Sequence, residues 1–229
     1  MKCNYCSKNT LICKGKRGIN QRYQCKNCGK YQQDFYSYKL YNSQDDKKIK
    51  ILNAEGVGIR SMSRILGYSQ GTIIRRIQHL ASKVIKPIYS ANNEVYEVDE
   101  MWSFVEKKKP SNYCWITYAI NRRTHEVIDV SFGSRSKENL GKVIRSVLSY
   151  KPKKIVTDKL NTYPGLIPSE LHDTTRYANN RIERSNLTLR TNIKRLSRKT
   201  ICFSKSKKML EACVLLYFDY HYWKICTKK

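Results

Sequence analysis

Negative charge is scarce in this sequence: 18 Asp and Glu stand against 45 Lys and Arg, a formal net charge of +27 over 229 residues. Long hydrophobic runs are also absent, so no membrane-spanning helix is expected, and the first residues, MKCNYCSKNT, lack the apolar segment of a secretion signal. These absences predict a cytoplasmic protein. The positive excess predicts a polyanionic partner, because neutralising phosphates and releasing their counterions supplies most non-specific affinity for nucleic acid.

Cysteine is not scarce, and its spacing indicates a metal site. Cys3 and Cys6 form one C-x2-C pair and Cys25 and Cys28 a second, with 18 residues between the pairs. Two such turns can supply four thiolates to one tetrahedral ion, which suits structural zinc. Residues 1–40 are therefore predicted to be a small zinc ribbon, and the alternative is four unrelated thiols. Four other cysteines flanked by apolar residues are interpreted as core residues: Cys114, Cys202, Cys213 and Cys226.

Residues 41–88 show three helical segments with glycine-containing turns between them. Ser43 is expected to cap the first helix, Gly67 to end the second and Ser69 to cap the third. The third helix has an apolar side and an opposite side whose donors suit base edges and phosphates. This side carries Gln70, Thr72, Arg75, Arg76 and His79. A short helix, a glycine turn and a basic amphipathic helix predict an all-α helix-turn-helix DNA-binding domain; the alternative is a small bundle with a solvated basic face.

The remaining segment, residues 89–229, changes to strand-like patterns. Expected elements are strands at 94–106, 113–121, 126–133 and 153–158, and helices at 136–150, 178–196 and 204–224. Three strands, a helix, a strand and further helices predict an α/β ribonuclease-H-like core, a mixed sheet flanked by helices. The whole chain is thus expected to be multidomain.

Three acids in this segment stand out by position. Asp99 lies inside a strand of otherwise apolar and aromatic residues, where a carboxylate is costly unless it is paired or bound to metal. Asp158 ends the 153–158 strand, and Glu183 is the single acid among eight Arg and Lys in residues 176–200. Two strands and a helix could bring these acids to two Mg2+ ions. The alternative for Glu183 is a surface residue on a solvated basic helix.

Other acids compete for the same roles. Glu97 is the main rival, since it shares a strand face with Asp99, whereas Glu100 points to the opposite face. The cations Arg190 and Lys194 lie beside Glu183 on its helix, at a spacing that would let them grip phosphates.

Four stretches together resemble transposases of the insertion-sequence-one family: "VDEMW" at 98–102, "VTDKLNTY" at 156–163, "RIERSNLTLR" at 181–190 and "RKTICFSKS" at 198–206. The resemblance implies a prokaryotic, nucleoid-associated enzyme whose catalytic Asp-Asp-Glu triad is Asp99, Asp158 and Glu183, holding Mg2+ or Mn2+. It further implies binding to double-stranded DNA at the element's terminal inverted repeats. Cleavage to a 3′-OH and strand transfer into target DNA would follow, in a homodimer or larger assembly.

Other functions remain open at this point. One is a catalytically silent zinc and helix-turn-helix DNA-binding regulator derived from a transposase, and another is a metal-dependent nuclease that cuts without joining. A tyrosine recombinase would have 17 tyrosines to choose from, but the Arg and His constellation that it needs is not evident.

Overall fold

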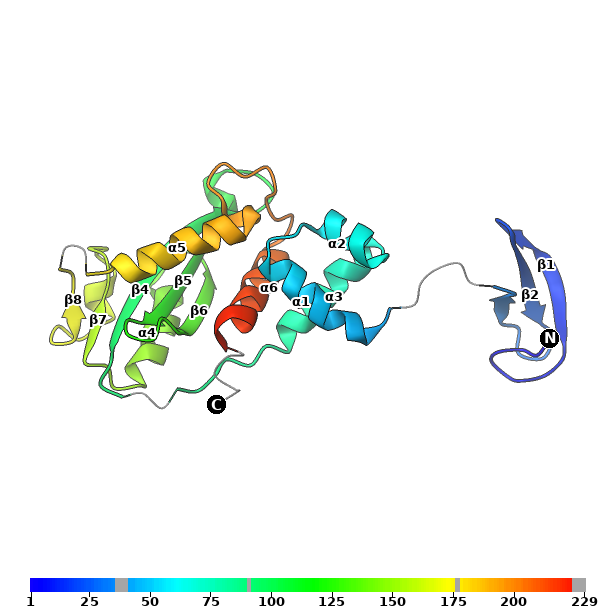
Figure 1. Ribbon diagram of the computed structural model, residues 1–229, viewed down its shortest axis with the longest axis horizontal. Helices are drawn as coiled ribbons and strands as arrows, with labels where there is room; N and C mark the ends of the chain where they lie inside the picture. The colour runs from blue at the N-terminus through cyan, green and yellow to red at the C-terminus, as the bar shows by residue number, and fades with distance from the viewer. Residues whose placement is uncertain (36–40, 90–91, 176–177, 224–229) are drawn as a thin grey trace. The chain divides into compact units, whose positions relative to one another are not determined.

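The computed structural model describes residues 1–35, 41–89, 92–175 and 178–223. It has two compact units, Met1–Leu40 and Tyr41–Lys229, each with its own internal packing (Figure 1). The first unit contains β1 (Leu11–Arg17), β2 (Asn20–Cys25) and β3 (Tyr31–Gln33). The helices of the second unit are α1 (Asp46–Ala54), α2 (Ile59–Leu66), α3 (Gln70–Ser82), α4 (Lys137–Leu148), α5 (Asn180–Asn192) and α6 (Lys207–Phe218). Its strands are β4 (Val95–Phe104), β5 (Tyr113–Asn121), β6 (Val127–Gly133), β7 (Lys154–Val156) and β8 (His172–Asp173).

In the first unit, β1, β2 and β3 form an antiparallel sheet in that order. Cys3 and Cys6 lie in and beside a turn before β1, whereas Cys25 is the last residue of β2 and Cys28 lies in the turn that follows it. Gly29 ends the second turn with a left-handed φ of 71°, and its N–H donates to the Cys25 carbonyl at 2.9 Å. Glycine adopts this conformation without the cost that a side chain imposes, so the local sequence favours the turn that positions both thiols.

The three predicted helices of the second unit are present as α1, α2 and α3. Gly67 ends α2 in the left-handed conformation, and the Ser69 hydroxyl caps α3 by accepting from the Thr72 N–H at 3.1 Å. The first cap differs from the expectation. The Asn42 side chain, rather than Ser43, accepts from the Gln44 N–H at 3.0 Å, because Ser43 lies inside a 3-10 turn that precedes α1.

The second unit is built on a mixed five-stranded sheet in the order β6-β5-β4-β7-β8. β4 pairs antiparallel with β5 and β5 with β6, whereas β4 pairs parallel with β7 and β7 with β8. α4 packs on one face of the sheet over Tyr96 and Val98, and α5 and α6 pack on the other face over Met101 and Tyr118 (Figure 1). The prediction of a mixed sheet flanked by helices is confirmed.

α6 joins the α1–α3 helices to the sheet. One side of α6 packs on the sheet through Leu210 and Val214, and another packs among α1, α2 and α3 through Met209 and Leu216. The Asn53 side chain of α1 also donates to a backbone carbonyl of α6 at 2.9 Å. The structure therefore unites residues 41–88 with the rest of the second unit, and the division of the chain into three domains stays a prediction.

The expectation that four cysteines lie in the core holds for two of them. Cys114 and Cys213 are buried as expected, but Cys202 is exposed, because it lies in an irregular segment between α5 and α6; Cys226 lies outside the described residues. None of the helices in the described residues is long and apolar enough to cross a membrane.

Candidate active site

Parallel pairing of β4 with β7 brings two of the predicted acids together. The register places Glu97 opposite Val156, so two residues further along both chains reach Asp99 and Asp158 at the same level. Both acids line a cavity of about 1170 Å³, and Glu183 lines it from the first turn of α5. The three carboxylates expected from the sequence therefore share one cavity.

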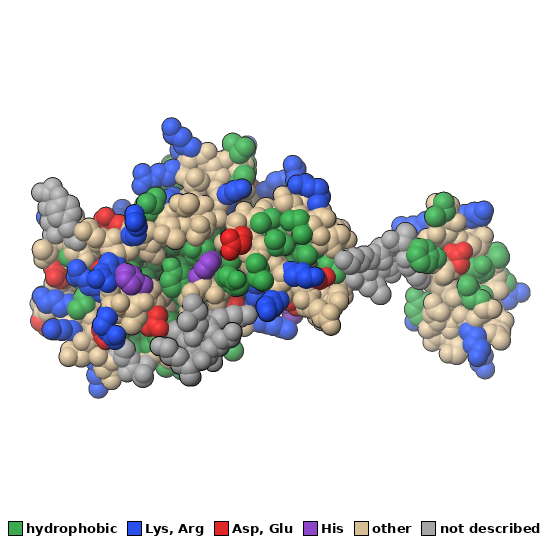
Figure 2. All heavy atoms as spheres, in the orientation of Figure 1, with side chains coloured by type: hydrophobic (Ala, Val, Ile, Leu, Met, Phe, Trp, Pro, Cys, Tyr) green, Lys and Arg blue, Asp and Glu red, His purple; other side chains and the backbone are tan. Residues whose placement is uncertain are grey.

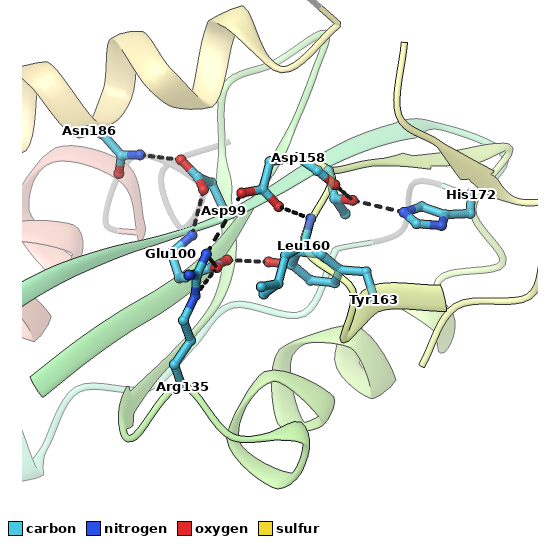
Figure 3. A network of polar contacts seen from close by, with 9 residues as sticks. Asp99, Glu100, Arg135, Asp158, Leu160, Tyr163, His172 and Asn186 are labelled. Carbon is cyan, nitrogen blue, oxygen red and sulfur yellow. Dashed lines mark hydrogen bonds and ion pairs between the residues drawn. The ribbon is translucent and has the colours of Figure 1, made fainter. Parts of the chain in front are cut away.

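Asp99 is half-buried and held by two hydrogen bonds (Figure 3). One carboxylate oxygen accepts from the Glu100 N–H at 2.8 Å, and the other accepts from the Asn186 side-chain amide at 2.6 Å. Burial, together with the negative charges of Glu100 and Asp158, raises the pKa of Asp99 to about 7. A cation in the cavity would oppose both effects, so this carboxyl group is suited to binding one.

Asp158 follows β7 in a tight turn. One of its oxygens accepts from the Leu160 N–H at 3.0 Å, which fixes the side chain locally, and the other lies 3.8 Å from the Arg135 guanidinium. Its side chain is 38% exposed. A carboxylate held closely at one oxygen and only distantly paired at the other can accept a ligand without losing its position.

Glu183 is exposed on α5 and turned toward the same cavity. The N-terminal turn of a helix favours a negative side chain there. Among the described residues no Lys or Arg lies within ion-pair distance of Glu183, although it is the single acid in a very basic stretch. The described contacts give it no role in balancing a particular cation.

The donors in the cavity suit a hard divalent cation, because Mg2+ prefers oxygen ligands. The three carboxylates are not gathered around one point. Among the described residues, the ligand atoms of the four cysteines lie within 4.8 Å of one another, and the three carboxylates do not form such a group. A two-metal site holds its ions about 3.5–4 Å apart, so its carboxylates need not share one ion. The cavity thus fits divalent cations by ligand type and by the raised pKa of Asp99.

Glu97, the main rival in the sequence, has a structural position instead. Its side chain is fully buried, and one oxygen accepts from the Ile182 N–H at 2.8 Å while the other lies 3.4 Å from the Arg122 guanidinium. Burial raises the pKa of Glu97. Because Glu97 belongs to β4 and Ile182 to the first turn of α5, this contact fixes the helix that carries Glu183 against the strand that carries Asp99.

Glu100 points to the opposite face of the sheet, as the alternation of a strand predicts. Arg135 donates to one of its oxygens at 2.6 Å and Tyr163 to the other at 2.5 Å (Figure 3). Arg135 also reaches Asp158, so a single guanidinium links the acids of the two strands. Burial raises the pKa of the Tyr163 phenol, which keeps it a hydrogen-bond donor.

Sequence reasoning did not single out Asn186 or Arg135. Asn186 lies three residues after Glu183 and therefore on the same side of the helix, a spacing that could have drawn attention to it. Its amide binds Asp99 while its carbonyl accepts from the Tyr118 hydroxyl at 2.9 Å. Arg135 precedes α4 in a loop and comes to the acids through the fold, so no local signal marks it.

The two predicted phosphate contacts differ from each other. Lys194 is exposed on the cavity rim. Arg190 also lines the cavity, but its guanidinium donates to the backbone carbonyls of Leu196 at 2.5 Å and Trp102 at 3.2 Å. Burial lowers the pKa of Arg190. These contacts explain why α5 ends at Asn192 rather than continuing to residue 196, since Arg190 supports a separate turn there.

Comparison with known families adds a decisive observation. The family model described as IS1 transposase matches residues 94–224, more than half of the chain, and the match includes Asp99, Asp158 and Glu183. The chain belongs to the IS1 transposase family. This confirms the resemblance drawn from the sequence motifs. Family membership implies DNA binding and identifies the chain as an enzyme that handles nucleic acid.

Curated relatives agree. The InsB protein of insertion element iso-IS1n from Shigella dysenteriae is 37% identical over 127 residues, which cover 56% of this chain and 95% of InsB. InsB of insertion element IS1 4 from Escherichia coli K12 is 30% identical over 128 residues, covering 56% and 75%. A simian T-cell lymphotropic virus intasome solved by cryoEM with PP2A regulatory subunit B56 gamma aligns with 76% of this chain and 68% of the matched chain. Its identity is 14% and its TM-score is 0.40.

In the first unit of this IS1-family transposase, the four predicted cysteines are gathered. The Cys3 and Cys28 sulfurs lie 3.6 Å apart, as do those of Cys6 and Cys25, and all four lie within 4.8 Å. Tetrahedral zinc with Zn–S bonds of about 2.3 Å separates its sulfurs by about 3.8 Å. A hydrogen bond with the Thr10 hydroxyl lowers the pKa of Cys25 to about 6, which favours the thiolate. The cluster is compatible with structural zinc.

The predicted DNA-facing side chains of α3 are partly used inside the fold. Gln70, Arg75 and His79 are exposed, and the Thr72 hydroxyl is paired with Ser69 at 2.9 Å. Arg76 was placed on the same side from the sequence, but its guanidinium binds Asp46 of α1. Its Nε and Nη2 donate to the two carboxylate oxygens at 3.1 and 2.5 Å, and the guanidinium also lies over the Tyr41 ring. Its charge is thereby directed to α1.

Proposed function

We propose that this chain is a DNA transposase that cleaves the ends of its element with a divalent-metal-dependent reaction and joins the resulting 3′-OH to target DNA. One observation carries the proposal: Asp99 and Asp158, from adjacent parallel strands, share a cavity with Glu183 in the region matched by the IS1 transposase family. The mixed sheet and its helices would then be a ribonuclease-H-like catalytic core.

Asp99, Asp158 and Glu183 would hold two Mg2+ or Mn2+ ions, which when bound supply activation of the attacking oxygen and stabilisation of the leaving oxygen. The protein's own groups set the positions. Asn186 fixes one oxygen of Asp99, and the turn at Leu160 fixes one oxygen of Asp158. Phosphodiester hydrolysis at the element end would leave a 3′-OH, and attack by that hydroxyl on target DNA would complete strand transfer, with no covalent enzyme–DNA intermediate.

Lys194 on the cavity rim would contact phosphate. Arg190 would hold the backbone at Leu196 and Trp102, and its positive charge would add to the attraction for phosphate in the cavity. The cysteine unit, residues 1–40, and the helices of residues 41–88 would bind the terminal inverted repeats, α3 presenting Gln70, Arg75 and His79 and holding Thr72 and Arg76 close to its own fold. The family match begins at residue 94, so this assignment depends on the residues themselves. Residues 89–229 would form the catalytic domain.

Two element ends must meet before joining, so a homodimer or larger assembly on DNA is expected, in the nucleoid of a prokaryotic cell. The deciding experiment is a strand-transfer assay. Purified protein is incubated with labelled duplexes from the two sequences that flank the gene, an unlabelled plasmid target, and Mg2+ or Mn2+. Glu183→Gln is run beside the wild type.

Joined product that is lost in Glu183→Gln would support the proposal and assign the glutamate. Cutting without joining would replace the transposase with a metal-dependent nuclease. Specific binding without cutting, by folded and zinc-loaded protein, would instead make the chain a DNA-binding regulator. Glu138→Gln is a matched control, because Glu138 lies on α4 with its side chain 83% exposed and does not line the cavity.

A further inference from the structure

The segment between α5 and α6 places an apolar side chain on the rim of the acidic cavity. Ile201 is 91% exposed and Leu187 of α5 is 56% exposed, yet both line the cavity that contains Asp99 and Glu183. Exposed aliphatic side chains cost solvation free energy, and their gathering at a functional cavity indicates a contact that forms with a partner. Trp102, half-buried in the same cavity, adds an aromatic surface.

Both ends of this segment are firmly held. At the start, Leu196 is buried and its carbonyl accepts from Arg190. At the end, Ser204 is buried, its carbonyl accepts from the Glu106 N–H at 2.8 Å, and its hydroxyl accepts from Arg195 at 2.8 Å. Between these anchors the chain presents Ile201 outward. Because both ends of the segment are anchored, the Ile201 side chain can press against a bound partner without being displaced.

The surroundings of Ile201 are cationic. Lys194, Arg198 and Lys199 line the same cavity, and among the described residues none of the three forms an ion pair. The neighbouring loop between β4 and β5 carries Lys107–Lys109, and the two loops lie side by side, joined by the pairing of Val105 with Ser204 (Figure 1). Figure 2 shows Lys and Arg side chains together with hydrophobic ones where these two loops project from the second unit. This combination of charge and apolar surface is complementary to nucleic acid.

We propose that Ile201 acts as a wedge: it inserts beside the scissile phosphodiester and unstacks the adjoining nucleotide, whose base then lies against Trp102. This inference rests on the proposed function and adds to it how the substrate is held. Apolar side chains inserted between base steps unstack and kink duplex DNA, and aromatic side chains stack with unpaired bases of any sequence. The cations around Ile201 would bind the flanking phosphates while the acids lie deeper in the same cavity.

The first test uses 2-aminopurine, which fluoresces more strongly when it leaves the base stack. The base is placed next to the cleavage position in duplexes from the element ends, and Ca2+ replaces Mg2+ to hold the uncut complex. We expect a several-fold fluorescence rise with the wild type and with Ile88→Ala, and little rise with Ile201→Ala. Ile88 is the matched control, since it is 93% exposed and does not line the cavity.

The second test measures end cleavage with Mg2+. Ile201→Ala should cleave paired duplexes about tenfold more slowly than the wild type, the scale of one lost stacking contact, and should recover to near the wild-type rate on duplexes with mismatches at the cleavage position. Wild-type cleavage without a fluorescence change would overturn the wedge and leave the proposed function standing. Equal rates for Ile201→Ala and the wild type on paired DNA would overturn it as well.

Two further outcomes are distinguishable. If Ile201→Ala alters the sedimentation of the DNA-free protein and leaves the fluorescence rise intact, Ile201 belongs to a contact between copies and the wedge is wrong. If the wild type neither cleaves nor binds the element ends, the proposed function and the wedge fall together.

Discussion

The four cysteines and the carboxylates of Asp99, Asp158 and Glu183 are both suited to binding metal, but their surroundings are opposite. The cysteine sulfurs lie within 4.8 Å of one another and two of the four residues are buried, whereas the carboxylates are spread around a cavity of about 1170 Å³ and Glu183 is exposed. A structural ion must complete its ligand sphere from the protein, so the fold has to gather the ligands. An ion that works on a substrate needs open positions, so the fold leaves its ligands apart.

The hydrogen bonds of the cavity carboxylates also leave these groups open to a ligand. Each carboxylate that is held, Asp99 by Asn186 and Asp158 by the turn at Leu160, is also accessible from the cavity. The comparison teaches that ligand identity alone does not separate the two roles; the separation lies in how completely the protein surrounds the ligand atoms.

The largest expected effect is the loss of zinc from the first unit. Structural zinc in small modules contributes about 10–16 kcal/mol of apparent binding free energy, which is also folding free energy. Cys25→Ser in the 229-residue chain should therefore abolish zinc retention and make residues 1–40 sensitive to protease, while the second unit melts as before. Zinc analysis and limited proteolysis measure this.

Cys13→Ser is the control for that experiment, because Cys13 is exposed on β1 and lies outside the cluster. It should keep both zinc and protease resistance. A Cys25→Ser protein that retains one zinc per chain would contradict the assignment of the four-cysteine cluster as a closed site.

A smaller effect is expected from pH at the open site. The folded-state pKa of Asp99 is about 7, above its ordinary value of about 3.9, so protonated Asp99 favours the fold below pH 4 and this contribution is lost as pH rises through 7. Mg2+ competes with that proton. Its apparent affinity should fall by about tenfold per pH unit below pH 7 and level off above it. Thermal melts with and without Mg2+ at pH 6 and pH 8 measure the difference.

The Asp99→Asn variant should lose this pH dependence, since the titrating carboxyl is gone. Equal Mg2+ stabilisation of the wild type at pH 6 and pH 8 would show that Asp99 does not bind the ion, and the open site would then resemble an ordinary acidic cleft.

Features of the two sites that depend on residues close together in the sequence could be predicted, whereas contacts between residues far apart in the sequence could not. The C-x2-C turns and the alternation that separates Asp99 from Glu100 depend on neighbours within a few residues, so they were predictable. The placement of Asp99 inside a strand was predictable as well, while its role as a metal ligand stays a prediction. The pairing of Glu97 with the start of α5 and the reach of Arg135 to Asp158 depend on residues far along the chain. No local pattern contains them.

Helix ends show the same limit. The apolar spacing predicts one helix over residues 178–196, but α5 ends at Asn192 because Arg190 supports a separate turn at Leu196. The 204–224 helix begins at Lys207 as α6 and passes into a π-helical turn at Asp219, where Lys50 of α1 pairs with that acid at 2.7 Å; residue 224 lies outside the described residues. Periodicity identifies a helix, and tertiary contacts decide where it stops.

Substitutions of Glu97 can separate an acid that stabilises the fold from the acids that line the cavity. Glu97→Ala should remove the acceptor for the Ile182 N–H and the partner of Arg122, which is expected to lower the free energy of unfolding by about 1–3 kcal/mol. End cleavage should fall because α5 loses its anchor on β4. Chemical denaturation and the cleavage assay measure the two effects.

The matched variant is Glu97→Gln, which keeps an acceptor for Ile182 and should recover most of the activity. Glu183→Gln should show the reverse pattern, with unchanged stability and no cleavage. If Glu97→Gln were as inactive as Glu183→Gln at full stability, Glu97 would belong to the reaction rather than to the framework.

The smallest effects are expected at two adjacent arginines of α3. Arg76 pairs with another residue of the fold, as Glu97 does, whereas Arg75 is exposed, as Glu183 is. Arg76→Ala removes a half-buried pair with Asp46 and should cost about 0.5–1 kcal/mol of stability. Arg75→Ala should leave stability unchanged, weaken DNA binding and lower the slope of log affinity against log salt by about one, since Arg75 is exposed and its charge is available to a phosphate. Thermal melts and salt-dependent fluorescence anisotropy separate the two. Identical behaviour of both variants would mean that the Asp46 pair does not hold Arg76 within the fold.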